Sequence, residues 1–354
     1  MLRTPTVLKS PREEAVRKRR EVIALERRTK SPVDSRRGHG GSAMTTMDAL
    51  LDCYFDSVVA GLDRSSLMLR RRRLQLVDFL SNAARGWCLA EGVSDPGFAV
   101  AAAVRRALRY HSDARASNGG VCRSGKYHDV LYVAAKLCVD WELRDHKVVA
   151  EVLVAVHGCE RSFERLLAGA LLGGKAAQLV SGWRGDSATP EESVAAAAYL
   201  FDAAARARLE HGEVRARTVD VPVDPYSGAA PARLALQLAN LPMLELLLRH
   251  GARVSAPDLG PLLARISESS GGASSCRDLA CLRLALRALP GLEPCLAPQG
   301  LVPPGRCGLA PPELKHLCRC AVREALWRGF QLPRGIALLP LPASLRDYLD
   351  LRQD

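Results

Sequence analysis

The sequence predicts an all-α protein, a helical solenoid that ends in a small helical module at the C-terminus. Of its 354 residues, 48% are hydrophobic and only 5% are aromatic. Leu, Ala and Arg dominate the composition, and these side chains lose little entropy in helices, whereas strands favour β-branched and aromatic residues. From Asn118 onward, helix-length apolar patterns alternate with turns at intervals of roughly three to four dozen residues, which indicates an internal repeat.

Residues 1–42 are predicted to form a disordered basic tail. The first 38 residues hold twelve basic and five acidic residues, and a glycine-rich stretch follows them. The cluster Arg17–Arg20, and a second cluster at Arg70–Arg73, could attract nucleic acid or an anionic membrane, but such runs are more often a solvated face. No aromatic residue interleaves the tail to stack on bases, so we expect neither nucleic acid nor a membrane as a partner. The sequence leaves open whether translation begins at Met1 or at Met44.

Residues 43–117 are predicted to form an N-terminal helical region of two or three amphipathic helices. Apolar residues recur there at spacings of three and four, which is the period of a half-buried helix. The turn Asn118–Gly120 separates this region from the repeat domain that we expect over residues 118–296.

One segment of the repeat domain, Asp224 to Asp258, resembles an ankyrin repeat over its whole length of about 33 residues. Pro231 can begin its first helix, and Gly251 can end its second helix in a left-handed conformation. Small residues at Ala235 and Ala239 would let the two helices approach closely.

Neighbouring segments carry weaker versions of the same pattern. Asp129–Ala135 matches the start of a unit whose second helix would run from Val148 to His157 and stop at Gly158. Val194–Glu210 would be a helix ending in Glu-His-Gly, and Gly260–Arg265 would begin a further unit. The alternative is an unrelated α-solenoid that contains a single ankyrin-like unit.

The C-terminal residues 305–354 predict a small module of three helices. Pro312 suits the first position of a helix whose apolar residues form a broad stripe at helical spacing. Leu339-Pro340-Leu341-Pro342 is a stiff extended segment, because each Pro fixes its own φ and restricts the residue before it. Ser344 and Asp347 have the spacing of a capping box for a last short helix. Alternatively, the module is a terminal cap whose stripe packs on the last repeat, with Cys318 as a core thiol.

Residues 312–351 resemble a SOCS box. Together with the ankyrin-like units, this makes the chain similar to the ankyrin-repeat and SOCS-box family, whose members are substrate receptors of cullin-RING ubiquitin ligases. The resemblance implies elongin B/C and cullin-5 with its RING partner as partners, and a protein substrate of unknown identity. It implies a place in the cytoplasm, with the nucleus as an alternative.

The same resemblance assigns roles to individual residues. Leu314 and Cys318 match the elongin-binding positions, and Leu339, Pro340, Leu341 and Pro342 match the segment that selects cullin-5. If the best unit presents its turn and first helix to the substrate, then the substrate-binding residues are Asp224, Tyr226 and Arg233.

No motif of an enzyme, a cofactor site or a metal site stands out in the sequence. Nucleotide-binding glycine motifs, HExxH and recognisable catalytic groupings are missing. The pairs Cys318–Cys320 and Cys276–Cys281 lack partners at zinc-like spacing, so we expect reduced thiols, no metal, no cofactor and no catalysis. The alternatives to a ligase adaptor are an ankyrin scaffold without ligase function and a basic binder of nucleic acid or membrane surfaces.

Overall fold

A computed structural model describes residues 66–92, 94–122, 126–181, 186–223, 228–268, 273–292 and 302–354. By its contacts the chain divides into residues 1–46 and 47–354, and all described residues belong to the second unit. The predicted tail 1–42 and the Arg17–Arg20 cluster therefore lie outside the described residues.

The prediction of an all-α fold is confirmed for the described residues. Besides the helices they contain one pair of two-residue antiparallel strands, β1 (Glu210–His211) and β2 (Ala216–Arg217). The α-helices are α3 (Ser66–Glu91), α4 (Pro96–Ala116), α5 (Lys126–Asp140), α6 (His146–Glu160), α7 (Glu164–Leu172), α8 (Gly174–Ser181), α9 (Pro190–Arg206), α10 (Pro231–Gln237), α11 (Leu241–Arg249), α12 (Ala256–Glu268), α13 (Ala273–Ala288), α14 (Leu314–Arg328), α15 (Arg334–Ala337) and α16 (Ala343–Leu349).

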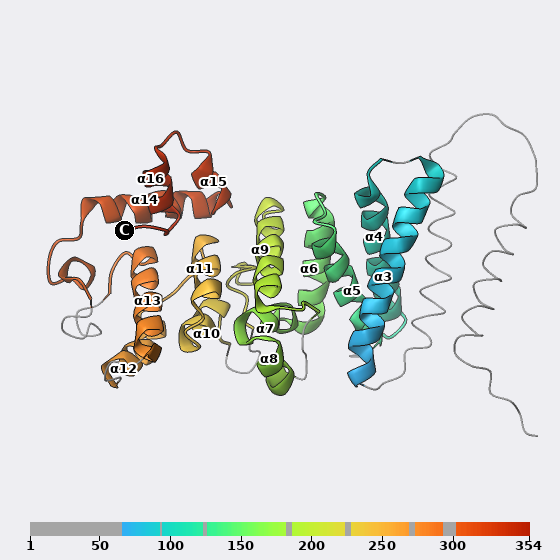
Figure 1. The fold of residues 1–354 in the computed structure, drawn as a ribbon, viewed down its shortest axis with the longest axis horizontal. Coiled ribbons are helices and arrows are strands. Elements are labelled where there is room, and N and C mark those ends of the chain that lie inside the picture. Colours follow the sequence, from blue (N-terminus) through green and yellow to red (C-terminus); the bar gives the residue numbers. More distant parts are fainter. Residues whose placement is uncertain are drawn as a thin grey trace, which may run out of the picture. The chain divides into compact units, whose positions relative to one another are not determined.

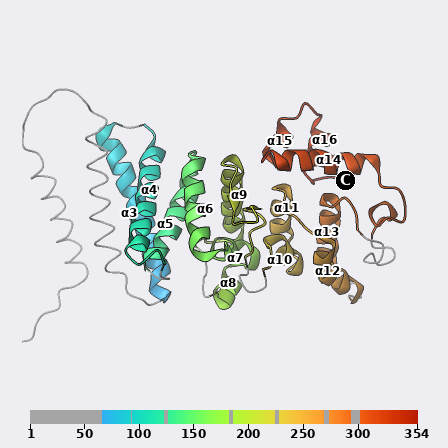
Figure 2. The ribbon, with the colours of Figure 1, turned by 180° about the vertical axis from the view of Figure 1, so that it is seen from behind.

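Helices α3 to α13 stand side by side in two layers (Figure 1). In one layer α4, α6, α9, α11 and α13 follow one another, and in the other α7, α10 and α12 do so. Each helix therefore packs mainly on its neighbours in sequence, as in a solenoid. The view from behind shows the same order, with α14 lying across the ends of α11 and α13 (Figure 2).

The interior of the stack is apolar and rich in alanine. A single buried cluster includes residues from Leu76 on α3 to Leu351 near the C-terminus. In α4, for example, the buried residues include Ala99 to Ala103 and Ala107. Small side chains let helix axes approach closely, so the stack gains its stability from close packing rather than from large aromatic groups.

Two local predictions for the segment Asp224–Asp258, a helix start at Pro231 and a left-handed helix stop at Gly251, are confirmed at α10 and α11. Pro231 is the first residue of α10, and Gly251 follows the end of α11 with φ of +85°. Asn240 caps α11 by accepting a hydrogen bond from the Met243 amide, and its amide group donates to the carbonyls of Ala170 and Leu171 at the end of α7. This side chain thus fixes the unit to the preceding helix.

Three of the predicted helix boundaries are wrong. Helix α6 does not stop at Gly158 but continues to Glu160 and ends at Arg161, whose φ is +59°. Cys159, which follows Gly158, still packs against the core of the stack. This tertiary packing outweighs the small loss of helix stability that one Gly causes. Helix α9 ends at Arg206, and the predicted Glu-His-Gly end forms strand β1 and its turn instead.

The third wrong boundary concerns the unit predicted to begin at Gly260. Helix α12 already begins at Ala256 and contains Pro261 in its second turn. Asp258 accepts hydrogen bonds from the amide and hydroxyl of Ser255, which ties the chain at the start of the helix. Pro261 thus lies inside the helix, where it removes one backbone hydrogen bond, and it does not mark the helix start.

One residue of the second basic cluster, Arg73, contributes to the fold, whereas Arg71 is exposed. The Arg73 side chain is buried and lies 3.1 Å from an Asp186 carboxylate oxygen and 3.8 Å from one of Asp129. In the described part of the chain, no helix has both the length and the apolar character needed to cross a membrane.

Candidate protein-binding site

The first helix of the C-terminal module, α14, turns its polar side inward and its apolar side outward. Its buried residues are His316, Arg319 and Arg323. By contrast, Leu314 is 76% exposed and Leu317 is 41% exposed, and Cys318 is exposed as well. The alternative of a cap whose stripe packs on the last repeat, with Cys318 as a core thiol, is therefore wrong.

The buried side of α14 is held by hydrogen bonds to backbone carbonyls at the ends of α11 and α13. The His316 ring lies with Nε2 2.8 Å from the Leu289 carbonyl oxygen. Arg323 donates to the carbonyls of Leu248 and Leu349. The last carbonyls of a helix have no partner within it and carry partial negative charge, so guanidinium groups suit this place.

Arg319 completes this inward face. The side chain is fully buried, and its guanidinium carbon lies 3.5 Å from the centre of the Tyr348 ring. It donates to the carbonyls of Arg287 and Gln353. Burial lowers the pKa of Arg319, and it lowers the pKa of Arg323 to about 10, so Arg323 remains charged at neutral pH.

The end of α14 is fixed by a second, aromatic contact. Trp327 makes cation–π contacts with two arginines. The guanidinium carbons of Arg217 and Arg253 lie 4.4 Å and 4.1 Å from its ring centre. Gly251 lies against the same ring, and a Cβ there would come within 2.5 Å of Trp327 Cδ1. The module is thus docked on the helix stack by directional contacts from both ends of α14.

The three helices of the module enclose a small core of their own. Leu332, Ile336 and Leu349 are buried together, and Leu339 and Leu341 pack against them. Pro340 and Pro342 are exposed. The predicted capping box is wrong: α16 begins at Ala343 after Pro342 and has no side-chain cap, because the fixed φ of that Pro already sets the start of the helix.

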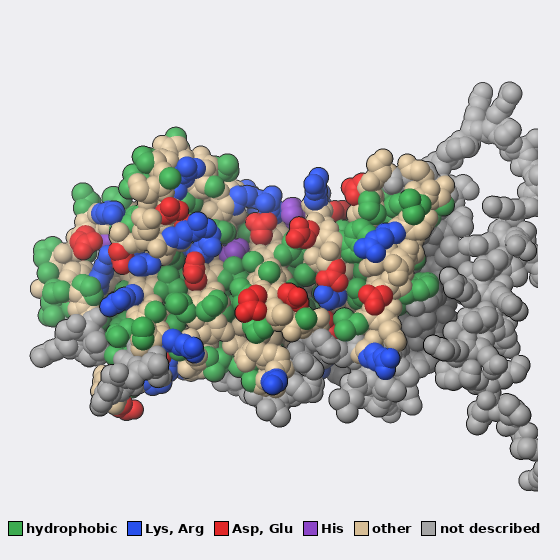
Figure 3. Space-filling view, viewed as in Figure 1, with side chains coloured by type: hydrophobic (Ala, Val, Ile, Leu, Met, Phe, Trp, Pro, Cys, Tyr) green, Lys and Arg blue, Asp and Glu red, His purple; other side chains and the backbone are tan. Residues whose placement is uncertain are grey.

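The exposed apolar side of α14 includes five residues. We call it the outward face and define it by the exposed residues Leu314, Leu317, Cys318, Ala321 and Ala325. Hydrophobic side chains reach the surface over the module at the upper left of Figure 3. Contiguous exposed apolar surface of this kind marks an interaction site more often than a free surface.

The predicted substrate residues are only partly described. Asp224 and Tyr226 lie outside the described residues. Arg233 is exposed on α10, and its Nε lies 3.8 Å from a carboxylate oxygen of Asp258 on α12. The structure thus pairs Arg233 with the next helix pair.

A second concave surface lies between α4, α6 and the end of α9. This groove has a volume of about 1470 Å³ and is strongly basic. Seven of its lining residues are basic, and two, Asp145 and Glu151, are acidic. The basic residues are Arg105, Arg109, Arg115, Arg144, Lys147, Arg206 and Arg208. Residue spacing gave no sign of this groove, since its side chains come from three separate segments.

Comparison with known proteins bears on the C-terminal module alone. Residues 310–350 match the family model of the SOCS box. No curated protein and no solved structure matches the chain, and no family match supports the ankyrin-like units. SOCS boxes in general connect adaptor proteins to elongin B/C and cullin ubiquitin ligases. The chain therefore carries a SOCS box, formed by α14, α15 and α16 behind a stack of helices.

Proposed function

We propose that this protein is a non-catalytic substrate receptor of an elongin B/C and cullin-5 ubiquitin ligase. The observation that carries the proposal is the outward face of α14 within the SOCS-box match. A helix that buries Arg and His and exposes Leu turns its apolar side away from the protein's own core, as interaction surfaces do. Elongin binding supplies a partner for this side.

Leu314 and Cys318 are proposed to bind elongin. They lie four residues apart, so both project from one side of α14, and both are exposed. Neither contributes to docking, which uses His316, Arg319 and Arg323. Binding and docking can therefore be changed separately by mutation.

The segment Leu339-Pro340-Leu341-Pro342 is proposed to select cullin-5. Its two Leu side chains pack on the module core while its two Pro side chains are exposed. This alternation suggests that Leu339 and Leu341 hold the segment in place and that Pro340 and Pro342 contact the cullin. The double variant Pro340→Ala with Pro342→Ala isolates the second role.

The substrate is proposed to bind to the helix stack, where Asp224, Tyr226 and Arg233 mark the ankyrin-like unit at α10 and α11. The basic groove between α4 and α6 is the competing location, and it would suit an acidic segment of a protein. Arg233→Ala with Tyr226→Ala tests the first location, and Arg144→Glu with Lys147→Glu tests the second. The variant pair that removes partners from an affinity-purification profile identifies the surface.

Co-purification tests the assembly directly. When the full chain is co-expressed with elongin B/C, we expect a stoichiometric complex that also captures cullin-5. We expect Pro340→Ala with Pro342→Ala to keep elongin and to weaken cullin-5. A wild-type chain that is folded but leaves elongin B/C behind would refute the ligase role and favour a scaffold of stacked helices.

A further inference from the structure

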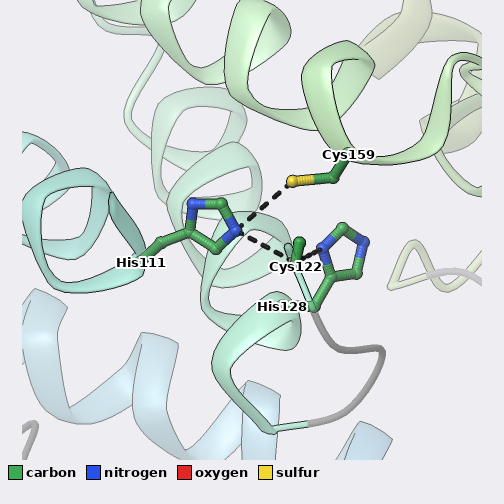
Figure 4. Close-up of side chains that lie close together, drawn as sticks. All are labelled: His111, Cys122, His128 and Cys159. Atoms are coloured by element: carbon green, nitrogen blue, oxygen red, sulfur yellow. Dashed lines mark hydrogen bonds between the residues drawn. The ribbon is translucent and has the colours of Figure 1, made fainter. Parts of the chain in front are cut away.

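Four potential metal ligands meet between α4, α5 and α6. His111 comes from α4, Cys122 from the segment after it, His128 from α5 and Cys159 from α6 (Figure 4). Their ligand atoms all lie within 4.8 Å of one another. The sequence predicts no metal site here, because the four residues stand far apart along the chain and show no zinc-like spacing.

Three sulfur–nitrogen distances in this cluster are close to those of a tetrahedral site. His111 Nε2 lies 3.3 Å from Cys122 Sγ and 3.4 Å from Cys159 Sγ, and His128 Nδ1 lies 3.3 Å from Cys122 Sγ. Zinc bonds of about 2.3 Å to sulfur and 2.0–2.1 Å to nitrogen at tetrahedral angles place S and N about 3.6 Å apart. Small side-chain movements would bring all four atoms to bonding distance of one ion.

The second shell orients one of the ligands. His128 Nε2 lies 2.6 Å from a carboxylate oxygen of Glu160, which leaves Nδ1 to face the cluster. The Tyr132 hydroxyl donates to the same oxygen at 2.6 Å, and Arg165 Nη1 lies 3.4 Å from it. A carboxylate that fixes the ring and tautomer of a ligating His is a regular feature of zinc sites.

The chemistry of the ligands selects the ion. Two sulfurs and two imidazole nitrogens are soft or intermediate ligands, which favours Zn²⁺ over Mg²⁺ or Ca²⁺. On binding, each Cys thiol would release its proton to solvent, and two thiolates would balance the charge of Zn²⁺. An uncharged site of this kind suits a place where His111 and His128 are both buried.

We propose that His111, Cys122, His128 and Cys159 bind one Zn²⁺ ion that joins α4, α5 and α6. Four protein ligands leave no open position, so the role is structural rather than catalytic. The ion would fix the N-terminal end of the helix stack beside the basic groove, which His111 also lines. This proposal is independent of elongin binding, because the ligands lie far along the chain from α14.

Metal content of the purified full chain tests the proposal. We expect one equivalent of zinc by mass spectrometry, and its loss in Cys122→Ser and in Cys159→Ser. Cys276→Ser is the matched control, because Cys276 is an exposed thiol on α13, and it should keep the zinc. Glu160→Gln should weaken zinc affinity about 10- to 100-fold, whereas Glu151→Gln, exposed on the same helix, should not.

If the variants of the metal ligands do not fold, a measurement on the wild-type chain tests the proposal instead. The wild-type chain, stripped by a chelator, is titrated with Co²⁺, and we expect the visible bands of a tetrahedral ion and a thiolate charge-transfer band at one equivalent. Absence of these bands in a folded chain, or zinc retained by both Cys variants, would overturn the proposal. A disulfide between Cys122 and Cys159 in the freshly purified chain would overturn it as well.

Discussion

In α9 the buried residues are Ala197, Leu200, Phe201, Ala203 and Ala204, whereas in α14 they are His316, Arg319 and Arg323. The first helix lies between neighbours on several sides and buries its apolar face against them. The second lies across the ends of helices and hydrogen-bonds to backbone carbonyls there. A helix therefore buries the face that suits its surroundings, and in α14 this leaves the apolar face available to a partner.

The two regions also differ in what holds them together. Close packing of small side chains is nondirectional and tolerates small shifts. The docking of α14 relies on a few hydrogen bonds and cation–π contacts, each with a defined geometry. Substitutions that remove those contacts should release the SOCS box while the helix stack remains folded.

The largest effect is expected from Arg323→Met. The substitution removes charge-assisted hydrogen bonds to Leu248 and Leu349, and each such bond contributes about 1.5–3 kcal/mol. Because Leu349 belongs to the module itself, only the bond to Leu248 joins the module to the helix stack, and we expect the free energy of docking to fall by about 1.5–3 kcal/mol. In the variant, amide hydrogens of α14 to α16 should exchange faster than in the wild type, while those of α9 should exchange at the wild-type rate.

The matched control is Arg328→Met. Arg328 lies on the same helix, but its side chain is 73% exposed and pairs only with Glu324. Exposed pairs of this type contribute little, so exchange in α14 should stay as in the wild type. Equal effects of both substitutions would contradict the docking role of the inward face.

A smaller effect is expected from Gly251→Ala. The residue has φ of +85°, and the added Cβ would lie 2.5 Å from Trp327 Cδ1. Backbone strain of this kind costs about 1–3 kcal/mol, and the contact with the ring adds to it. Gly212→Ala separates the two causes, because Gly212 has φ of +67° and nothing near its Cβ position.

Unfolding experiments on the two glycine variants give the comparison. Both should lose stability, and Gly251→Ala should lose more. Only Gly251→Ala should also quench or shift Trp327 fluorescence. If the two variants lose the same amount, the approach of Gly251 to Trp327 does not contribute to docking.

The smallest effect is the response to acid, which should differ between the two regions. Burial, together with the neighbouring His157, lowers the pKa of His211 to about 4, and its Nε2 lies 3.0 Å from the Thr218 hydroxyl. An unfolded His takes up its proton near pH 6.5, so the folded state binds fewer protons between pH 6.5 and 4. The free energy of unfolding of the stack should therefore decrease as the pH is lowered from 6.5 to 4. For this one residue the decrease is at most about 1.4 kcal/mol per pH unit.

His211→Gln keeps a side chain that can bond to Thr218 but does not titrate. Its thermal unfolding should show a weaker dependence on pH between 7 and 5. Arg323, which docks α14, stays charged throughout that range. An unchanged pH slope in His211→Gln would contradict the assignment.

Local signals predicted much of this molecule from its sequence. Pro231 and Gly251 act within their own turns, and the SOCS box is one continuous stretch of residues, so both could be recognised without a fold. The end of α6 could not, because packing carries the helix past Gly158. Likewise, the apolar stripe of α14 was visible in sequence, but which face is buried depends on the carbonyls of α11 and α13.

Groups assembled from distant segments gave no signal in the sequence. His111, Cys122, His128 and Cys159 follow no known spacing, because three helices must pack before their side chains meet. The same holds for the basic groove, whose residues come from α4, α6 and the end of α9. Such sites can be predicted only when it is known which helices pack against one another, and this depends on tertiary contacts.

The most direct test of the outward face is a titration of elongin B/C with Leu314→Ala combined with Cys318→Ala. Truncating a pocket-filling Leu typically costs about 2–5 kcal/mol, which reduces affinity by about one and a half to three and a half orders of magnitude. Leu309→Ala is the control, since Leu309 is 72% exposed but precedes the matched residues. We expect a hundredfold weaker complex for the double variant at an unchanged melting temperature, and wild-type affinity for the control. Wild-type affinity in the folded double variant would contradict the account.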